Sequence, residues 1–227
     1  MRLLLTSAGL VNEGSCAAVA ALARRPLSSL ALAVVPTAAN VVPGDKGWLI
    51  ADYVNFQRAG FAQVDVVDVS ALEPAVWRAR LEEADVLAVT GGDTTHLLRQ
   101  VRASGLAGAL EELLRERVYV GVSAGSMVTG PHLRLSRSVQ ERPGDGTGLG
   151  LVDFLVQPHL DSPWFPSAGE DVVREAVAGF AHTTYALGDG RAVLVDGGAV
   201  SVVGEGRCLV LPGVPAGHRG GGSAGRG

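Results

Sequence analysis

The sequence contains little cysteine and no large excess of charge of either sign. Its 227 residues include only Cys16 and Cys208, which lie near opposite ends of the chain. Two such distant cysteines form neither a disulfide framework nor a metal-ligand cluster, so we expect a protein of the reducing cytoplasm without metal or cofactor. The 19 basic and 23 acidic residues give a formal net charge of -4. This balance argues against nucleic acid or an anionic membrane surface as a partner.

Long apolar runs are also missing. Thr6 and Ser7 interrupt the apolar start of the chain before the core of a signal peptide could form. No window approaches the ~20 continuous apolar residues that a membrane-spanning helix needs. Hydrophobic residues nevertheless make up 47% of the chain, which is enough for the core of one domain. We therefore expect a small molecule, rather than a membrane or a nucleic acid, as the partner.

Apolar segments of strand length alternate with helix-like stretches through the first half of the chain. Strands are expected at 2–5, 30–35, 64–69, 85–89 and 118–122. Helices are expected at 14–24, 46–59, 75–83 and 95–116, the last with a break near Gly105 and Gly108. This alternation is typical of a parallel sheet that is covered by helices on both faces.

The pattern changes in the last fifth of the chain. Short strands joined by Gly-rich turns are expected at 191–195, 199–203 and 207–211, as in an antiparallel meander. The predicted fold class is therefore α/β: a three-layer α/β/α sandwich with a mostly parallel sheet, plus a C-terminal antiparallel β meander. We expect one domain over residues 1–214 and a Gly-rich, disordered tail over 215–227.

A glycine–serine motif follows the β-branched strand at 118–122. Residues 121–125 have the sequence Gly-Val-Ser-Ala-Gly, which matches Gly-x-Ser-x-Gly. In such a motif the serine occupies a sharp turn from strand to helix, and small neighbours are needed because larger side chains would clash. The N–H of Ala124 would then point to the position of an oxyanion. Ser123 is thus the candidate nucleophile, and the alternative is an ordinary tight turn.

A second glycine pair, Gly91-Gly92, follows the preceding predicted strand and leads into Asp93 and Thr94. Parallel strands present their C-terminal loops at one edge of the sheet, so we expect this loop beside Ser123. The N–H of Gly92 could supply a second oxyanion donor. Asp93 and Thr94 are candidate substrate-binding residues; the alternative, which does not exclude the first, is that one of them caps the next helix.

A serine hydroxyl is a weak nucleophile unless a base takes its proton, and histidine is the usual base. Of the five histidines, His159 is the best placed, because the strand expected at 151–156 would bring it to the edge of the sheet that holds Ser123. The alternative base is His132, although Pro131 is expected to turn it away. A carboxylate should orient the imidazole, and the segment between Ser123 and His159 offers three: Glu141, Asp145 and Asp153.

Together these motifs resemble a known family. Gly-Gly-Asp-Thr-x-x-Leu-Leu at 91–98, Gly-Val-Ser-Ala-Gly-Ser at 121–126 and Pro158-His159 are similar to the peptidase E (aspartyl dipeptidase) family of serine peptidases. Relatives of that family include cyanophycinases, and its fold resembles that of class I glutamine amidotransferases. The resemblance covers the chain from its first strand to about Leu211. It implies a serine peptidase that hydrolyses short peptides, as a dipeptidase with Asp-Xaa substrates among the candidates, and that acts as a monomer or homodimer.

The resemblance also bears on the third member of the triad. Aspartyl dipeptidases have an Asp at the position that corresponds here to Ser138, and a serine cannot supply the negative charge. Cyanophycinase-like relatives use a Glu slightly further along, at the position of Glu141. The resemblance therefore favours a Ser123–His159–Glu141 triad.

Substrate choice is predicted less sharply. Asp-specific members of the family bind the substrate aspartate through an arginine that follows the catalytic histidine. Arg174 is the only arginine in the helix expected at 170–180, but Gly169 and Asp171 lie nearer the family position. Two further functions stay open: a cyanophycinase-like hydrolase of isopeptides or other amides, and a non-catalytic amidotransferase-like binding module, against which the Ser–His pair argues.

Overall fold

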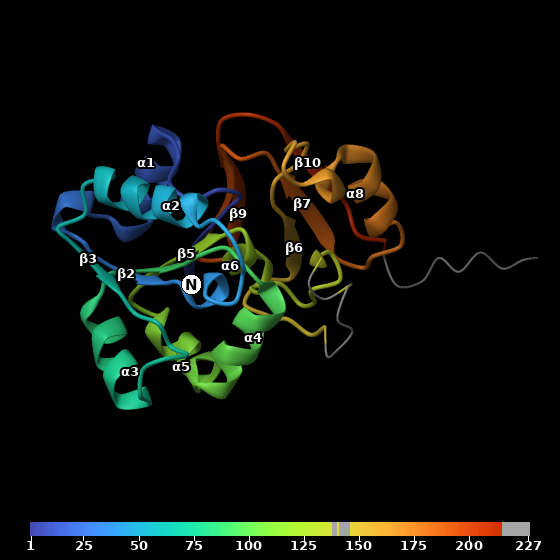
Figure 1. The fold of residues 1–227 in the computed structure, drawn as a ribbon. Coiled ribbons are helices and arrows are strands. Elements are labelled where there is room, and N and C mark those ends of the chain that lie inside the picture. The colour runs from blue at the N-terminus through green and yellow to red at the C-terminus, as the bar shows by residue number, and fades with distance from the viewer. Residues whose placement is uncertain (138–139, 141–145, 215–227) are drawn as a thin grey trace, which may run out of the picture.

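Five parallel strands and an antiparallel hairpin form a seven-stranded sheet in the computed structural model, which describes residues 1–137, 140 and 146–214 (Figure 1). The strand order is β3-β2-β4-β5-β1-β8-β9, and β8 and β9 are antiparallel to their neighbours. The bounds are β1 Arg2–Thr6, β2 Ala31–Val35, β3 Gln63–Val66, β4 Val86–Val89, β5 Val118–Val122, β8 Arg191–Asp196 and β9 Ala199–Gly204.

Helices cover both faces of this sheet. Alternate residues of β1 point to opposite faces, so that Leu3 and Leu5 belong to one hydrophobic core and Leu4 to the other. The core around Leu4 is closed by α1 (Glu13–Ala23) and α2 (Gly47–Arg58). The opposite core is closed by α3 (Pro74–Glu83), α4 (Thr94–Ala103) and α5 (Leu106–Leu113). Burial on both faces explains why β4 and β5 are apolar throughout, and the predicted three-layer sandwich is confirmed.

The break predicted within residues 95–116 lies at Gly105. This glycine separates α4 from α5 with a φ of 83°, a left-handed conformation that a residue without Cβ adopts at little cost. Three short 3₁₀ helices complete the helical elements of the described ranges: η1 Leu27–Ser29, η2 Thr37–Ala39 and η3 Pro166–Ala168. None of the helices in these ranges has the length and apolar character to cross a bilayer.

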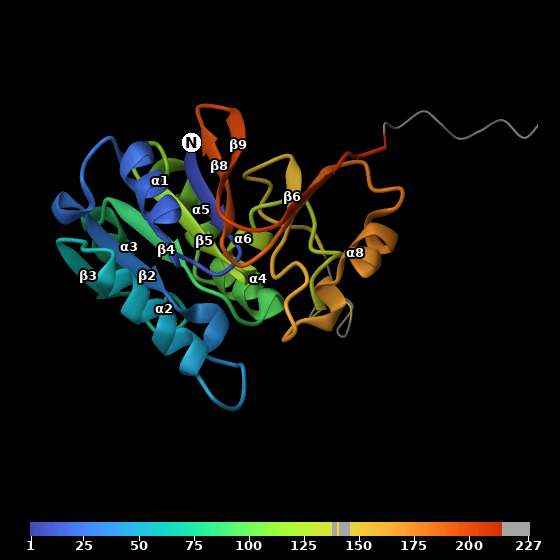
Figure 2. The same cartoon turned by 90° about the horizontal axis from the view of Figure 1, so that it is seen from above.

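The remaining strands form a second, three-stranded sheet. Its order is β10-β7-β6, with β6 (Phe154–Gln157) parallel to β7 (Thr183–Leu187) and β10 (Cys208–Leu211) antiparallel to β7. Seen from above, this sheet and α8 (Glu170–Val177) lie to one side of the larger sheet (Figure 2). The prediction that the strand before His159 belongs to the sheet of Ser123 was therefore wrong.

The antiparallel C-terminal strands are confirmed, but they divide between the two sheets. β8 and β9 form a hairpin on the edge of the larger sheet, whereas β10 pairs with β7. Between them the chain turns at Gly204, which has a φ of 85° and passes so close to Gly190 that a Cβ would meet its carbonyl oxygen at 2.2 Å. After this close approach to Gly190, the chain leaves the hairpin and continues to β10 in the smaller sheet.

The helix α2 carries a partly buried carboxylate, that of Asp52, which has no hydrogen-bond donor beside it within the described ranges. Asp52 faces Gly9 of the loop after β1, where a Cβ built on Gly9 would lie 3.5 Å from the Oδ1 of Asp52. Burial raises the pKa of Asp52 from 3.8 to about 7.

This raised pKa predicts a pH-dependent stability. Between pH 3.8 and about 7 the folded protein retains a proton on Asp52 that the unfolded chain releases, so this contribution to stability falls as the pH rises through that interval. Asp52→Asn abolishes the titration. The free energy of unfolding of the variant, minus that of the wild type, should therefore rise by about 1–3 kcal/mol from pH 5 to pH 8, as measured by urea denaturation. Asp196→Asn, a matched loss of charge on β8, should show no such gain; parallel curves for Asp52→Asn and the wild type would contradict the prediction.

Candidate active site

Ser123 forms the turn between β5 and the short helix α6 (Ala124–Met127). Its backbone has φ 50° and ψ −107°, a combination that residues with a side chain rarely adopt. The N–H groups of Ser126 and Met127 donate to the Ser123 carbonyl at 2.9 and 3.0 Å and hold the turn. A strained conformation that the surrounding structure enforces is typical of functional sites.

Glycines make this turn sterically possible. A Cβ at Gly121 would lie 2.8 Å from the backbone of Ser126, and a Cβ at Gly125 would lie 2.0 Å from the carbonyl oxygen of Val89. Both distances are shorter than any real contact allows, so larger residues would force the strands and the helix apart. The predicted need for small residues around Ser123 is thereby confirmed.

The loop after β4 lies beside Ser123, as predicted, because β4 and β5 are neighbours in the sheet. A Cβ built on Gly91 would lie 3.2 Å from the Cβ of Ser123. Gly92 has a φ of 135°, and a Cβ there would collide with the carbonyl oxygen of Ala38 at 2.2 Å. Within the described ranges no acceptor receives the N–H of Gly92 or of Ala124. Two free donors thus flank the serine.

Asp93 is the N-cap of α4. Its carboxylate accepts a hydrogen bond of 2.8 Å from the backbone N–H of His96, which confirms the capping alternative. Thr94, the first residue of the helix, is buried. Substrate binding by Asp93 and Thr94 stays a prediction.

His159 reaches Ser123 from the second sheet. It follows β6, and its Nε2 lies 3.0 Å from the Oγ of Ser123. Its backbone has a φ of 62°, and its N–H donates to the Oγ of Ser7 at 2.8 Å. The structure thus brings together the serine and the histidine that the sequence singled out, although the histidine comes from an unexpected sheet.

Asp189 contacts the other nitrogen of the same imidazole. Its Oδ1 lies 2.7 Å from the Nδ1 of His159 and accepts a hydrogen bond of 3.1 Å from the hydroxyl of Ser7. The hydrogen bond with His159 lowers the pKa of Asp189 and, with the attraction of the imidazolium and the Ser7 bond, outweighs the opposing effect of burial. The carboxylate is therefore ionised at neutral pH.

Asp189 was not predicted from the sequence, because it lies outside the segment between Ser123 and His159 in which the carboxylate was expected. Asp189 lies 30 residues beyond the histidine, in the Gly-Asp-Gly turn that joins β7 of the smaller sheet to β8 of the larger one. An isolated aspartate in a glycine-rich turn is a weak signal, since such turns are common at the surface.

Of the three carboxylates predicted from the sequence, only Asp153 lies within the described residues. Glu141 and Asp145, together with Ser138, lie outside the described residues, so the prediction for Glu141 stays a prediction. Asp153 lies within them and contacts His182, with 3.2 Å between its Oδ1 and the Nε2 of the histidine.

The alternative base, His132, has other surroundings. Its ring packs edge-on against those of Phe180 and His182, with centroids 5.1 and 5.6 Å apart. Burial, reinforced by the nearby His182 and Arg134, lowers the pKa of His132. The observed partner of Ser123 is His159, and this favours His159 as the base.

Arg174, the candidate for binding a substrate carboxylate, is engaged within its own helix. Its Nε donates to the Oε1 of Glu170 at 2.7 Å, and Glu170 also pairs with Arg207. The side chain of Arg174 is half exposed. Both its Nε and one terminal nitrogen contact the same oxygen, Oε1 of Glu170, so this edge of the guanidinium would have to leave Glu170 before it could bind a substrate carboxylate.

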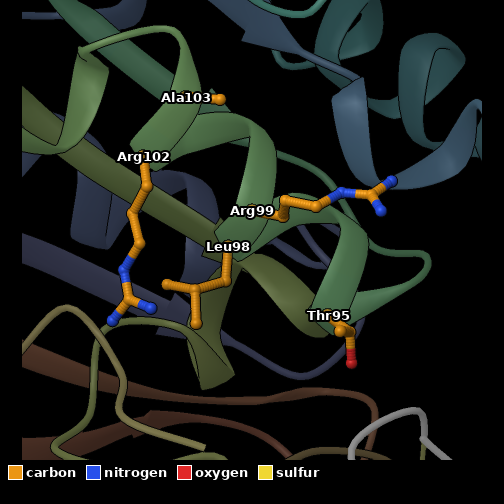
Figure 3. A pocket seen from close by; sticks show the side chains of 5 residues that line it. All are labelled: Thr95, Leu98, Arg99, Arg102 and Ala103. Carbon is orange, nitrogen blue, oxygen red and sulfur yellow. The ribbon is translucent and has the colours of Figure 1, made fainter. Parts of the chain in front are cut away.

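A surface hollow of about 450 Å³ lies away from this chemistry. Figure 3 shows that the side chains lining it all come from α4: Thr95, Leu98, Arg99, Arg102 and Ala103. Neither Ser123 nor His159 borders it. Among the described residues no group of three or more His, Cys, Asp or Glu side chains could hold a metal ion. The chemistry available at the candidate site is therefore that of a serine, an imidazole, a carboxylate and two free amides.

Comparison with known proteins points in the same direction. The sequence profile of peptidase family S51 matches residues 3–203. An uncharacterized peptidase of Pasteurella multocida is 27% identical over 157 residues, which cover 65% of this chain and 73% of that protein. Peptidase E of Streptomyces coelicolor is 40% identical over 88 residues, 37% of this chain and 36% of that protein, so the match spans about a third of that relative's length.

Two solved structures have the same fold. A protein from Listeria monocytogenes that is provisionally assigned as a peptidase E superposes with a TM-score of 0.76 at 23% identity, over 90% of this chain and 98% of that one. A peptidase from an acI-B1 Actinobacterium superposes with a TM-score of 0.69 at 20% identity, over 94% of this chain and 91% of that one.

The tight packing at the Ser123 turn predicts the effect of one added methyl group. Gly125→Ala places a Cβ against the Val89 carbonyl, 2.0 Å away, and should lower the free energy of unfolding by about 2–4 kcal/mol. Gly108→Ala is the matched control: Gly108 lies in α5 with nothing within 4 Å, so an alanine should stabilise the protein by about 0.5–1 kcal/mol. Urea denaturation measures both. If Gly125→Ala were as stable as the wild type, the described packing around Ser123 would be incorrect.

Proposed function

The chain belongs to peptidase family S51 and is a serine-type peptidase, and from this premise we propose that it hydrolyses short peptides through an acyl-enzyme formed on Ser123. The observation that carries the proposal is the distance of 3.0 Å between the Oγ of Ser123 and the Nε2 of His159. A nucleophile and base within hydrogen-bond reach, with the base oriented by a third group, are the signature of this chemistry. The β5–Ser123–α6 turn then serves as a nucleophile elbow.

In the proposed mechanism His159 first acts as base and then as acid. It accepts the Ser123 proton on Nε2 while the Oγ attacks the peptide carbonyl, and it returns that proton to the leaving amine. Water then enters, gives a proton to His159 and attacks the ester carbonyl. As the ester bond breaks, His159 returns that proton to the Oγ of Ser123, which releases the acid product and restores both residues. The same imidazole serves both half-reactions.

Asp189 is the third member of the proposed triad. Its carboxylate lies 2.7 Å from the Nδ1 of His159 and, being ionised, can fix the tautomer that presents a free Nε2 to Ser123. The same charge stabilises the imidazolium that forms as Ser123 attacks. Glu141 remains the competing candidate, and mutation separates the two.

Oxyanion stabilisation is assigned to the backbone N–H groups of Gly92 and Ala124. Both flank Ser123 and lack an acceptor within the described ranges, and such preorganised donors commonly contribute ~3–4 kcal/mol to transition-state stabilisation. The N–H of Ser123 itself is used elsewhere, since it donates to the carbonyl of Thr6 at 3.2 Å. The helix α6 is a single turn, so the two local amides matter more than a helix dipole.

Dipeptides are the proposed substrates, without a strict requirement for an N-terminal aspartate. The pairing of Arg174 with Glu170 supports this, because it occupies the one arginine that the family resemblance made a candidate for that aspartate. A panel of Asp-Xaa, Xaa-Xaa and β-aspartyl dipeptides distinguishes the proposal from a cyanophycinase-like isopeptide hydrolase.

Ser123→Ala should abolish covalent labelling by a fluorophosphonate probe, because only an activated serine reacts with it. The wild-type protein should bind one probe per chain, which intact-mass spectrometry measures. Ser201→Ala, on the exposed strand β9, should label like the wild type. A wild-type protein that resists the probe would favour a non-catalytic binding module, and labelling that persists in Ser123→Ala would place the nucleophile elsewhere.

Asp189→Asn should slow labelling and peptide hydrolysis by about 10²- to 10⁴-fold, because the neutral amide removes the counter-charge of the imidazolium and can reverse the tautomer. Asp153→Asn removes one negative charge from the same half of the molecule and should be nearly neutral. The comparison that decides the triad is Glu141→Gln. If that change is damaging and Asp189→Asn is not, the carboxylate role belongs to Glu141 and the proposed triad is wrong.

A further inference from the structure

An aromatic ring covers one face of the His159 imidazole. The rings of Phe165 and His159 are stacked, with centroids 4.1 Å apart and planes inclined by only 9°. The ring edge of His159 already contacts Ser123 and Asp189, so Phe165 restrains the remaining degree of freedom, the tilt of the ring plane. The side chain of His159 is only 14% exposed, whereas the stacked Phe165 is 45% exposed.

The segment that carries Phe165 is held by its own hydrogen bonds. The N–H of Ser162 donates to the His159 carbonyl at 3.0 Å, and the N–H of Phe165 donates to the Ser162 carbonyl at 3.0 Å. The N–H of Asp161 in turn donates to the carbonyl of Ala168 at 3.0 Å. The loop from 159 to 168 is thus closed on itself, and its own hydrogen bonds hold Phe165 against the imidazole.

Charges at this loop are largely paired with one another. The carboxylate of Asp161 accepts from the N–H of Glu170 at 2.9 Å and pairs with Arg207, which also pairs with Glu170. Asp189 is the one charged group among the described residues in hydrogen-bonding contact with the His159 ring. Within the described ranges, the protonated form of His159 therefore has one directly bonded counter-charge, and an effect of Phe165 would add to that of Asp189.

The stack has different consequences for the two protonation states. A flat aromatic face attracts a cation through the negative charge density of its π system, so it favours imidazolium over neutral imidazole. In the proposed reaction, the imidazolium is the state that His159 enters when Ser123 attacks. We propose that Phe165 is a positioning residue for the base: by face-to-face stacking it fixes the plane of His159 and stabilises its protonated form. This inference rests on the proposed function.

Histidine NMR tests the stack independently of turnover. Histidine labelled with ¹³C at Cε1 gives five ring signals, one for each histidine of the chain, and His159→Gln identifies the relevant one. In the wild type, ring current from Phe165 should shift the His159 ring protons upfield. Phe165→Leu keeps an apolar cover but removes the π face. We expect the upfield shift of the His159 ring protons to disappear in this variant, because the ring that causes it is gone.

Two variants control this measurement. Phe165→Tyr retains the aromatic face and should restore the upfield shift. Phe180→Leu removes the ring that packs on His132, so it should move the His132 signal and leave His159 unchanged. If the His159 ring signal is the same in Phe165→Leu as in the wild type, the proposal is overturned.

Reaction with the fluorophosphonate probe connects the stack to the chemistry. At a pH above which the labelling rate no longer increases, Phe165→Leu should be labelled about 2- to 5-fold more slowly than the wild type. Phe165→Tyr should be labelled at close to the wild-type rate. Equal rates for all three proteins would contradict a role in catalysis even if the NMR shift is present. If instead the wild type shows the NMR shift but does not react, the serine-peptidase mechanism fails while the effect of Phe165 on His159 stands.

Discussion

The hydroxyl of Ser7 joins the two sheets at the candidate active site, and the geometry of the other residues depends on this junction. It accepts from the N–H of His159 at 2.8 Å and donates to Asp189 at 3.1 Å. Ser7 directly follows β1, the strand next to β5, and the residue after β5 is Ser123. One buried side chain therefore sets the position of an imidazole from the smaller sheet against a serine from the larger one.

The second constraint is steric. Ser123 has a strained backbone, and Gly91, Gly121 and Gly125 pack so closely around it that no larger residue fits without displacement. Strain of this kind costs of order 1–3 kcal/mol and persists only where the surroundings enforce it. Here the surroundings are the buried strands β4 and β5, whose burial on both faces supplies the hydrophobic stabilisation that offsets the strain.

Charge is distributed unevenly around the site. Asp189 is ionised beside His159. Two arginines of the same region are paired with other carboxylates: Arg174 with Glu170, and Arg207 with both Glu170 and Asp161. An oriented imidazole with an ionised carboxylate on its far nitrogen suits a reaction on a neutral peptide carbonyl. Among the described residues, the pairing of Arg174 with Glu170 agrees with the proposed tolerance for peptides that lack an N-terminal aspartate.

The amino-acid sequence by itself determined the layered architecture and the serine. Alternating apolar segments specify a parallel sheet between helices, because strands buried on both faces must be apolar throughout. The Gly-x-Ser-x-Gly motif specified the turn at Ser123, because the glycine at 121 is required by the close approach of Ser126, which lies in the same turn. These features are local, and local patterns can be recognised without knowledge of the tertiary structure.

Only the tertiary structure decided which sheet supplies His159 and which carboxylate contacts it. Strand pairing such as β6 with β7 and β7 with β10 depends on contacts between distant segments, and an apolar strand of four residues does not indicate which sheet it joins. Asp189 approaches His159 because the chain crosses from β7 to β8 at that point and Ser7 holds both. A residue 30 positions from its partner carries no spacing signal in the sequence, because its role arises from where the two sheets meet.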